Sequence, residues 1–224
     1  ERWFQAIHDY QGNAAAAPTF ALEICLRKVA SSDLWDFSRF KHLYVGSETV
    51  PYEILRRFVN KYSSIGLEQN SLKPVYGLAE STLLVAGGGL GLQNLNNHFK
   101  DRQVGKFQRI LTPYKIDHAS TTIRIQDLES GVELPDSKEG EIFIEATYNS
   151  NGYHKGEIHD ISENHEPIIG TGDLGFIQDG FLYITGRRKE IVIVRGANYS
   201  AEDLEYAVRY DQDLLQSDNL TVCL

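Results

Sequence analysis

Strand-like and helix-like segments alternate over the first third of the chain, and this alternation restricts the fold more than any other feature. Residues 14–17, 42–45 and 73–76 are short runs that are typical of buried strands. Residues 19–29 and 51–62 lie between them, and their apolar residues recur at helical spacing. Strands and helices that alternate at these lengths form a parallel sheet. The sequence therefore predicts an α/β unit.

Two loops of this predicted sheet are candidates for ligand binding. Ligands of open parallel sheets bind at the carboxyl ends of the strands. The loops that follow the second and third predicted strands are residues 46–49 and 77–82. The glycine-rich stretch 87–91 lacks the Lys-Ser/Thr pair that completes a phosphate loop, and we interpret it as a connection. A further amphipathic helix is predicted over residues 2–10.

Apolar residues in the second half of the chain recur with a period of two. Residues 122–125 and 141–144 have this pattern, which predicts antiparallel β structure. Asp179-Gly180 lies between two β-forming runs and predicts a tight hairpin. Ser200 with Asp203 three residues later predicts the start of a helix. Residues 92–118 have no clear periodicity, and no structure is predicted for them. A last strand is predicted over 219–224.

A carboxylate and a basic triplet flank the predicted hairpin. Asp173 lies in a glycine-rich segment that predicts a turn, and Arg187, Arg188 and Lys189 precede the apolar strand 191–194. Cations beside a carboxylate suggest a functional site. Solvated charges at the ends of two hairpins explain the same spacing equally well, so the spacing alone decides nothing.

The composition excludes several classes of partner. With 22 Lys and Arg against 31 Asp and Glu, the net charge is −9, which disfavours nucleic acid or an anionic membrane as a main partner. Cys25 and Cys223 are far apart and indicate neither a disulfide framework nor a zinc site. The histidines between residues 154 and 165 fit no compact metal pattern and are interpreted as a solvated loop. We predict a cytoplasmic protein with no integral membrane segment.

Two motifs resemble those of the adenylate-forming enzymes, which include acyl-CoA synthetases, luciferases and peptide-synthetase adenylation domains. Gly170-Thr171-Gly172-Asp173 is similar to the family's Thr-Gly-Asp motif, whose Asp holds the ribose hydroxyls of ATP. Gly186-Arg187-Arg188-Lys189-Glu190 resembles its Gly-Arg-x-Lys-Asp hinge motif, with Glu190 in place of the Asp. The resemblance implies that Asp173 and Arg187 bind the ribose and that Lys189 is the hinge of a small C-terminal domain.

A third motif narrows the resemblance to the fatty acyl-AMP ligase branch. Tyr76-Gly77-Leu78-Ala79-Glu80 is similar to the family's Tyr-Gly-x-Thr-Glu motif, with Ala79 in place of the Thr. The resemblance implies that Tyr76 packs on adenine, that Glu80 holds Mg²⁺, and that the loop from Gly46 lines the adenine. It also implies that the segment near Phe20 faces the acyl chain. The implied nucleotide-binding residues are Gly46, Ser47, Glu48, Tyr76, Gly77, Leu78, Ala79, Glu80, Asp173 and Arg187.

The resemblance implies a fatty acid–AMP ligase that uses ATP and Mg²⁺ and passes the acyl group to an acyl-carrier protein. An acyl-CoA synthetase, with CoA as the acceptor, is the alternative from the same class, and a catalytically degenerate lipid-sensing or interaction module is the alternative from another class. The chain starts at Glu1 and contains no methionine, which indicates a fragment. We expect the phosphate loop before Glu1 and the adenylation lysine after Leu224, so this fragment alone should not catalyse the reaction.

The predicted fold class is α/β: a parallel βαβ sheet part, an antiparallel β-barrel-like subdomain, and the start of a small α+β C-terminal domain. The barrel-like character comes from the resemblance, since Gly140-Glu141-Ile142 and Asn151-Gly152-Tyr153 are similar to the family's β-barrel segment. The predicted boundaries are 1–103, 104–186 and 187–224.

Overall fold

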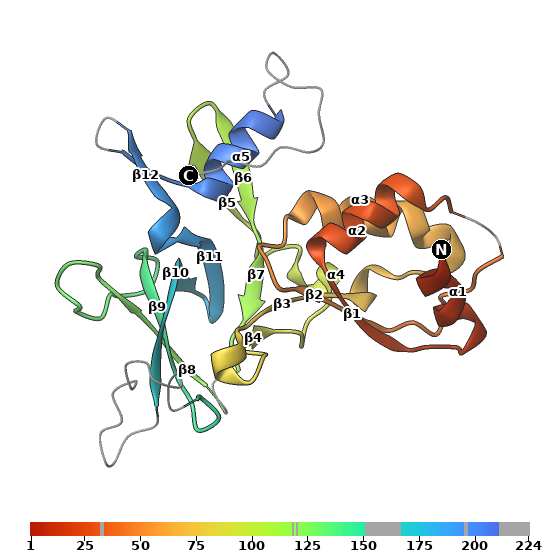
Figure 1. The fold of residues 1–224 in the computed structure, drawn as a ribbon, viewed down its shortest axis with the longest axis horizontal. Coiled ribbons are helices and arrows are strands. Elements are labelled where there is room, and N and C mark those ends of the chain that lie inside the picture. The colour runs from red at the N-terminus through yellow and green to blue at the C-terminus, as the bar shows by residue number, and fades with distance from the viewer. Residues whose placement is uncertain (32–33, 118, 120, 151–166, 195–196, 211–224) are drawn as a thin grey trace. The chain divides into compact units, whose positions relative to one another are not determined.

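The computed structural model describes residues 1–31, 34–117, 119, 121–150, 167–194 and 197–210 (Figure 1). The chain forms two compact units. The first unit comprises Glu1–Phe99 and Thr112–Asp117, and the second comprises Lys100–Leu111 and His118–Leu224. The three functional parts predicted from the sequence, with boundaries after residues 103 and 186, stay a prediction.

The first unit contains the predicted parallel sheet. Its strands are β1 (Ala14–Pro18), β2 (His42–Gly46), β3 (Leu72–Tyr76) and β4 (Ala86–Gly87), and they lie side by side in that order. β1, β2 and β3 are parallel, as the alternation of strands and helices predicts. β4 is antiparallel to β3 and was not predicted.

The helices of the first unit are α1 (Arg2–Asp9), α2 (Thr19–Lys28), α3 (Tyr52–Tyr62) and α4 (Leu92–Leu95). Short 3-10 turns follow at η1 (Ser63–Ile65), η2 (Gln69–Ser71) and η3 (Ala79–Ser81). α2 and α3 lie side by side (Figure 1).

An aromatic cluster forms the centre of the first unit's core. The ring of Tyr62 lies 4.8 Å, between centroids, from the rings of both Phe4 and Phe58. Its hydroxyl donates to the carbonyl oxygens of Cys25 and Val29, each at 2.8 Å. Burial raises the pKa of the Tyr62 hydroxyl. A tyrosine fits here because its polar end has partners at the end of α2, while its ring packs as a phenylalanine would.

The second unit contains the predicted antiparallel strands. β8 (Thr122–Gln126), β9 (Gly140–Glu145), β10 (Ile168–Gln178) and β11 (Phe181–Arg187) follow one another in this order, each antiparallel to the next. Within the described part of the chain these strands form an open sheet and no closed barrel. Asp179 and Gly180 both have positive φ, 54° and 74°, which confirms the predicted tight hairpin.

The segment that the sequence left open contains a second hairpin. β5 (Lys100–Val104) and β6 (Phe107–Leu111) pair in antiparallel register and belong to the second unit. β7 (Pro113–Lys115) then belongs to the first unit, where Ile116 bridges to Ala86.

The C-terminal part of the second unit starts with a 3-10 turn, η4 (Arg188–Glu190), after β11. β12 (Ile191–Val194) and β13 (Ala197–Ser200) form a hairpin, and α5 (Ala201–Tyr210) follows. The sequence predicted the strand at 191–194, and it did not predict that Ala197 and Asn198 begin a second strand, β13. The Asp203 N–H donates to Ser200 Oγ at 3.1 Å, and the Ser200 N–H donates to Asp203 Oδ2 at 3.5 Å, which confirms the predicted cap of α5.

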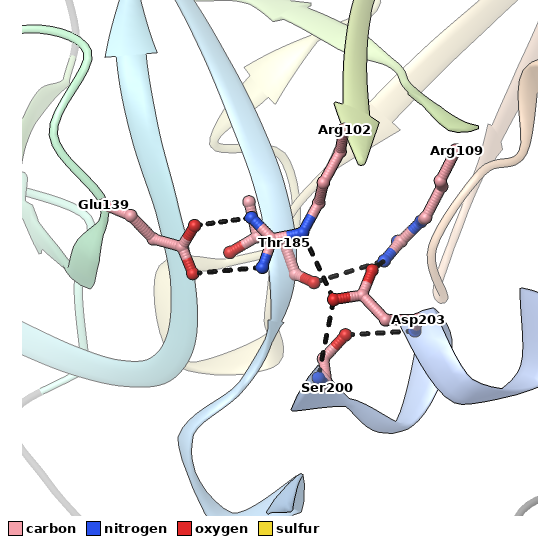
Figure 2. Close-up of polar contacts among 6 residues, drawn as sticks. All are labelled: Arg102, Arg109, Glu139, Thr185, Ser200 and Asp203. Carbon is pink, nitrogen blue, oxygen red and sulfur yellow. Dashed lines mark hydrogen bonds and ion pairs between the residues drawn. The ribbon is translucent and has the colours of Figure 1, made fainter. Parts of the chain in front are cut away.

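Asp203 also joins α5 to the β5–β6 hairpin through a buried ionic network (Figure 2). The Asp203 side chain is 2% exposed and accepts from Arg109 Nη1 at 2.8 Å and from Arg102 Nε at 3.2 Å. Arg109 donates in addition to the carbonyl oxygen of Thr185 in β11, and Arg102 pairs with Glu139. The network therefore connects four segments of the chain: the β5–β6 hairpin, Glu139, β11 and α5.

Candidate functional site

Asp173 lies on a bulge in β10. Gly170 pairs with Phe143, and Leu174 pairs with Glu141, so that residues 171–173 lie opposite Ile142 alone. Gly172 has a φ of +72°, a backbone conformation that favours glycine. The sequence predicted a glycine-flanked turn here; the correct description is a bulge inside a strand, because pairing with β9 resumes at Leu174.

The polar groups of the bulge are satisfied by the bulge itself and by β9. Thr171 Oγ1 donates to the carbonyl oxygen of Ile142 at 2.9 Å and accepts from the Asp173 N–H at 3.0 Å. The Gly172 N–H donates to Glu141 Oε1 at 3.3 Å. These bonds fix the backbone before Asp173, and the pairing of Leu174 with Glu141 fixes it after Asp173, so the carboxylate is presented by a preformed bulge.

Asp173 and Arg187 form an ion pair across β10 and β11. They are register partners, and Arg187 Nε lies 2.9 Å from Asp173 Oδ1. The Asp173 side chain is 13% exposed and that of Arg187 is 61% exposed. The pair joins a fixed carboxylate acceptor to a guanidinium whose donors reach the surface, which suits a ligand that carries both hydroxyls and anionic oxygens.

Lys189 and its neighbours occupy the short turn that connects two strands. Lys189 is exposed and lies at the centre of η4, between the end of β11 and the start of β12. Arg188 precedes it and donates from Nη1 to Glu141 Oε2 at 2.8 Å. No sequence pattern indicates this last contact, because the two residues are 47 positions apart.

The other predicted residues lie at the carboxyl ends of the parallel strands in the first unit. Gly46 ends β2 and is the register partner of Pro18 in β1, and Tyr76 ends β3. A Cβ on Gly46 would lie 2.6 Å from the Val75 side chain, and a Cβ on Gly77 would lie 1.5 Å from the carbonyl oxygen of Leu83. Both glycines are therefore required by the close approach of neighbouring backbone.

The loop after Tyr76 is closed on itself. The Val85 N–H donates to the Tyr76 carbonyl at 2.9 Å, and the Ser81 N–H donates to the Leu78 carbonyl at 3.2 Å. The Tyr76 ring is half-buried, 6.2 Å from the ring of Tyr114 between centroids. Glu80 is half-buried and Ala79 exposed, both in η3. The structure therefore brings Tyr76 and Glu80 together in one compact loop.

The loop that begins at Gly46 is attached to α2. Ser47 has a positive φ of 72°, and the carboxylate of Glu48 accepts the Phe20 N–H at 2.7 Å. Pro18 is the N-cap residue of α2 and makes no side-chain cap hydrogen bond. Glu48 thus provides the acceptor for the first turn of α2, although it lies 28 positions further along the chain.

The structure keeps the predicted site residues in two groups, one in each unit. Tyr76, Glu80 and the Gly46 loop belong to the first unit, and Asp173, Arg187 and Lys189 belong to the second. Their convergence on one nucleotide stays a prediction.

One cavity of the first unit has a volume of about 260 Å³, and none of the predicted residues lines it. No group of three or more His, Cys, Asp or Glu in the described residues could hold a metal ion. Arg195, the histidines 154, 159 and 165, Asn151–Tyr153 and the strand predicted at 219–224 lie outside the described residues.

Comparisons with known proteins give one family and a consistent set of relatives. The family described as AMP-binding enzyme matches residues 1–154. The 4-hydroxyphenylalkanoate adenylyltransferase of Mycobacterium tuberculosis is 31% identical over 93% of this chain and 37% of its own length. The long-chain-fatty-acid–AMP ligase FadD28 of the same organism is 29% identical over 93% of this chain and 40% of its own. The chain thus spans about two fifths of these relatives.

Solved structures support the same fold. A fatty acyl-adenylate ligase from a study of the Escherichia coli and Legionella pneumophila enzymes superposes with a TM-score of 0.77 at 24% identity, over 96% of this chain and 42% of that one. The L. pneumophila ligase with acyl adenylate and pyrophosphate superposes with a TM-score of 0.73 at 24% identity, over 94% and 40%. Among the described residues, no helix is both long and apolar enough to cross a membrane.

Proposed function

Because the chain belongs to the AMP-binding enzyme family, we propose that it is the adenylate-holding part of a fatty acid–AMP ligase. The reaction joins a fatty acid to ATP. The fatty acid carboxylate attacks the α-phosphorus, the bond from that phosphorus to the pyrophosphate oxygen breaks, and acyl-AMP and pyrophosphate result. Negative charge accumulates on the phosphate oxygens during this step, so positioned donors contribute more than a strong base.

The bulge of β10 is the observation that carries the proposal. Its hydrogen bonds hold the Asp173 backbone without a ligand, and Arg187 stands 2.9 Å from the carboxylate. In the proposed complex Asp173 accepts hydrogen bonds from the ribose hydroxyls, and Arg187 donates beside it. A carboxylate that is fixed before binding loses little conformational freedom when the nucleotide arrives.

The residues of the first unit would hold the base and the metal. Tyr76 would present its ring to adenine, and its partner Tyr114 supports it. The backbone of Gly46, Ser47, Gly77, Leu78 and Ala79 would line the base. Glu48 would contribute through its backbone, since its carboxylate accepts from Phe20.

Glu80 provides the oxygen donor expected for Mg²⁺. Nucleotide-bound Mg²⁺ takes one or two protein carboxylates and completes its shell with phosphate oxygens and water, so a single carboxylate fits. When bound, the ion neutralises charge on the phosphates. Lys189 is proposed as the hinge residue, because it lies in the turn between β11 and β12.

The acyl group would then pass to the thiol of an acyl-carrier protein, with AMP leaving. The names of the curated relatives and the Tyr-Gly-Leu-Ala-Glu motif favour this over an acyl-CoA product. The proposed enzyme acts in the cytoplasm.

An ATP–pyrophosphate exchange assay on the full-length protein, with fatty acids of increasing chain length, tests the proposal. We expect exchange that depends on the fatty acid, and acyl-AMP as the product when CoA is present without carrier protein. Asp173→Asn removes a charged acceptor, worth about 1.5–3 kcal/mol, and should reduce kcat/KM for ATP roughly 10- to 150-fold. Arg124→Ala is the matched control, because Arg124 pairs with Glu145 in the same sheet and not with a residue of the bulge.

The outcomes separate the alternatives. Acyl-CoA formed at the rate of exchange would identify an acyl-CoA synthetase. Binding of a non-hydrolysable acyl-adenylate mimic without any exchange would identify an interaction module. Equal kinetics for Asp173→Asn and wild type would remove Asp173 from the nucleotide site.

A further inference from the structure

Glu141 on β9 binds two different segments with its two carboxylate oxygens. Oε1 accepts the Gly172 N–H of the bulge at 3.3 Å. Oε2 accepts Nη1 of Arg188 in η4 at 2.8 Å. The bulge carries Asp173 and η4 carries Lys189, so one side chain contacts both functional segments of the second unit.

The burial of Glu141 makes both contacts necessary. Its side chain is 11% exposed, whereas that of Arg188 is 53% exposed. A buried carboxylate needs a cation or several donors, because desolvation of an unpaired charge is costly. If Arg188 moved away, Glu141 would keep the Gly172 N–H as its recorded donor but lose its cation.

Arg188 occupies the unspecified position of the hinge motif Gly-Arg-x-Lys-Asp. The resemblance to the adenylate-forming enzymes therefore assigns it no role. The contact joins residues 47 positions apart and follows from the structure alone.

We propose that Glu141 is a positioning residue that couples the Asp173 bulge to the conformation of the η4 turn. This inference rests on the proposed function, in which Asp173 holds the ribose and Lys189 is the hinge. With Arg188 on Oε2, Oε1 is aimed at Gly172 and the bulge is held. A rotation at η4 that withdraws Arg188 frees the carboxylate to turn, and the bulge loses a constraint.

Coupling of this kind is reciprocal. If the η4 conformation strengthens nucleotide binding at Asp173, bound nucleotide must favour that conformation by the same factor. Glu141 would therefore make release of the adenylate depend on the state of the hinge.

Two substitutions separate the two arms of Glu141. Glu141→Gln keeps an oxygen for the Gly172 N–H but presents an amide to Arg188. Arg188→Gln removes the cation and leaves Glu141 unchanged, and Arg188→Lys restores the charge. Arg188→Gln leaves the Glu141 carboxylate, whose side chain is 11% exposed, without its cation and should lower the thermal stability. Binding and exchange are therefore measured well below the unfolding transition of each variant. Arg124→Gln and Glu145→Gln remove a comparable pair from the same sheet and are the controls.

The test measures the Kd of a non-hydrolysable acyl-adenylate mimic and the amide exchange of residues 168–178 in the full-length protein. We expect Glu141→Gln and Arg188→Gln each to weaken binding about 5- to 10-fold, at the low end of usual coupling. The double variant should be no weaker than either single variant, and Arg188→Lys should recover part of the loss. Exchange in the bulge should rise in both single variants and stay unchanged in both controls.

Failure of this inference is distinguishable from failure of the proposed function. If wild type binds the mimic and Arg188→Gln binds it equally well with unchanged bulge exchange, the coupling is refuted while the function stands. Additive effects in the double variant would also refute it. A wild type that binds no mimic would refute the proposed function, and this inference with it.

Discussion

Removal of the Asp203 carboxylate should be among the most damaging single changes in the second unit. In the variant Asp203→Ala, Arg109 stays buried, with a side chain that is 7% exposed, and loses its carboxylate partner. Arg109 keeps only the Thr185 carbonyl, and Arg102 keeps Glu139. Half of the capping box of α5 is lost in the same step: the Ser200 N–H loses its acceptor, whereas the N–H of residue 203 still donates to Ser200 Oγ.

The expected magnitude follows from these losses. Breaking a buried ion pair by removing one partner costs about 3–5 kcal/mol, because an uncompensated charge stays buried. Loss of one hydrogen bond of the capping box adds about 1 kcal/mol or less. Both losses come from the same side chain and are not independent. We therefore expect the free energy of unfolding to fall by about 4 kcal/mol, close to the sum of the lower estimates.

Hydrogen exchange of the α5 amides under native conditions is the appropriate assay, because it reports opening of this region within the full-length protein. A loss of about 4 kcal/mol predicts exchange roughly a thousandfold faster wherever opening of α5 limits it. Asp179→Asn is the control: its pair with Lys100 is long, at 3.8 Å, and Asp179 is 68% exposed, so the change should stay within about 1 kcal/mol.

A double-mutant cycle with Arg109→Ala completes the experiment. Because the two side chains share one buried interaction, the double variant should lose far less than the sum of the single losses. An Asp203→Ala variant that lost less than about 1 kcal/mol, or a cycle that proved additive, would refute the reasoning from burial and pairing.

Three further substitutions test single features of the structure. Gly77→Ala puts a Cβ 1.5 Å from the Leu83 carbonyl oxygen and should cost at least about 3 kcal/mol in thermal unfolding, whereas Gly89→Ala, with no atom within 4 Å, should be close to neutral; equal stabilities would contradict the closed loop. Tyr62→Phe removes a hydroxyl that donates to two carbonyls and should lower the free energy of unfolding by about 1–3 kcal/mol in urea titration, and an unchanged midpoint would contradict those bonds. Burial raises the pKa of Glu202, so the folded state favours the protonated carboxyl. The stability that this preference provides is fully present below the unfolded carboxyl pKa, about 4.3, and is lost as the pH rises through the folded pKa. Glu202→Gln should therefore be more stable than wild type at neutral pH, with no advantage below about pH 4, and an advantage confined to acid would reverse the assigned sign.

Local patterns predicted the parts of this fold that are built from neighbouring residues. Asp179-Gly180 predicted its hairpin because two successive positive φ values can hardly be supplied by other pairs. Ser200 and Asp203 predicted the start of α5 because a capping box satisfies its N–H groups within four residues. The parallel sheet pairs residues 28 positions apart, and it was predictable because alternating strands and helices at these lengths allow few other topologies.

Contacts between distant residues account for what the sequence did not predict. Glu48 caps α2 across 28 residues, and no local pattern indicates a cap at that separation. The bulge at Asp173 was described as a turn because only the register with β9 distinguishes the two. In the β5–β6 hairpin, Arg102 pairs with Glu139 and Asp203, which lie 37 and 101 positions away in the sequence. Helical or strand periodicity in the sequence does not indicate pairs at these separations.

The bulge also explains why Asp173 can serve a ligand while it remains part of a sheet. In a regular strand the direction of a side chain is set by strict alternation, and each backbone N–H is used by the ladder. In the bulge, three residues of β10 lie opposite one residue of β9, so neither constraint holds between Gly170 and Leu174. The freed groups would be costly if unsatisfied, yet Thr171 and Glu141 take them up. The position of Asp173 is thus specified by β9 and by side chains near it, and Arg187 is held opposite by register. A catalytic role for this part of the chain therefore needs no loop to order on binding.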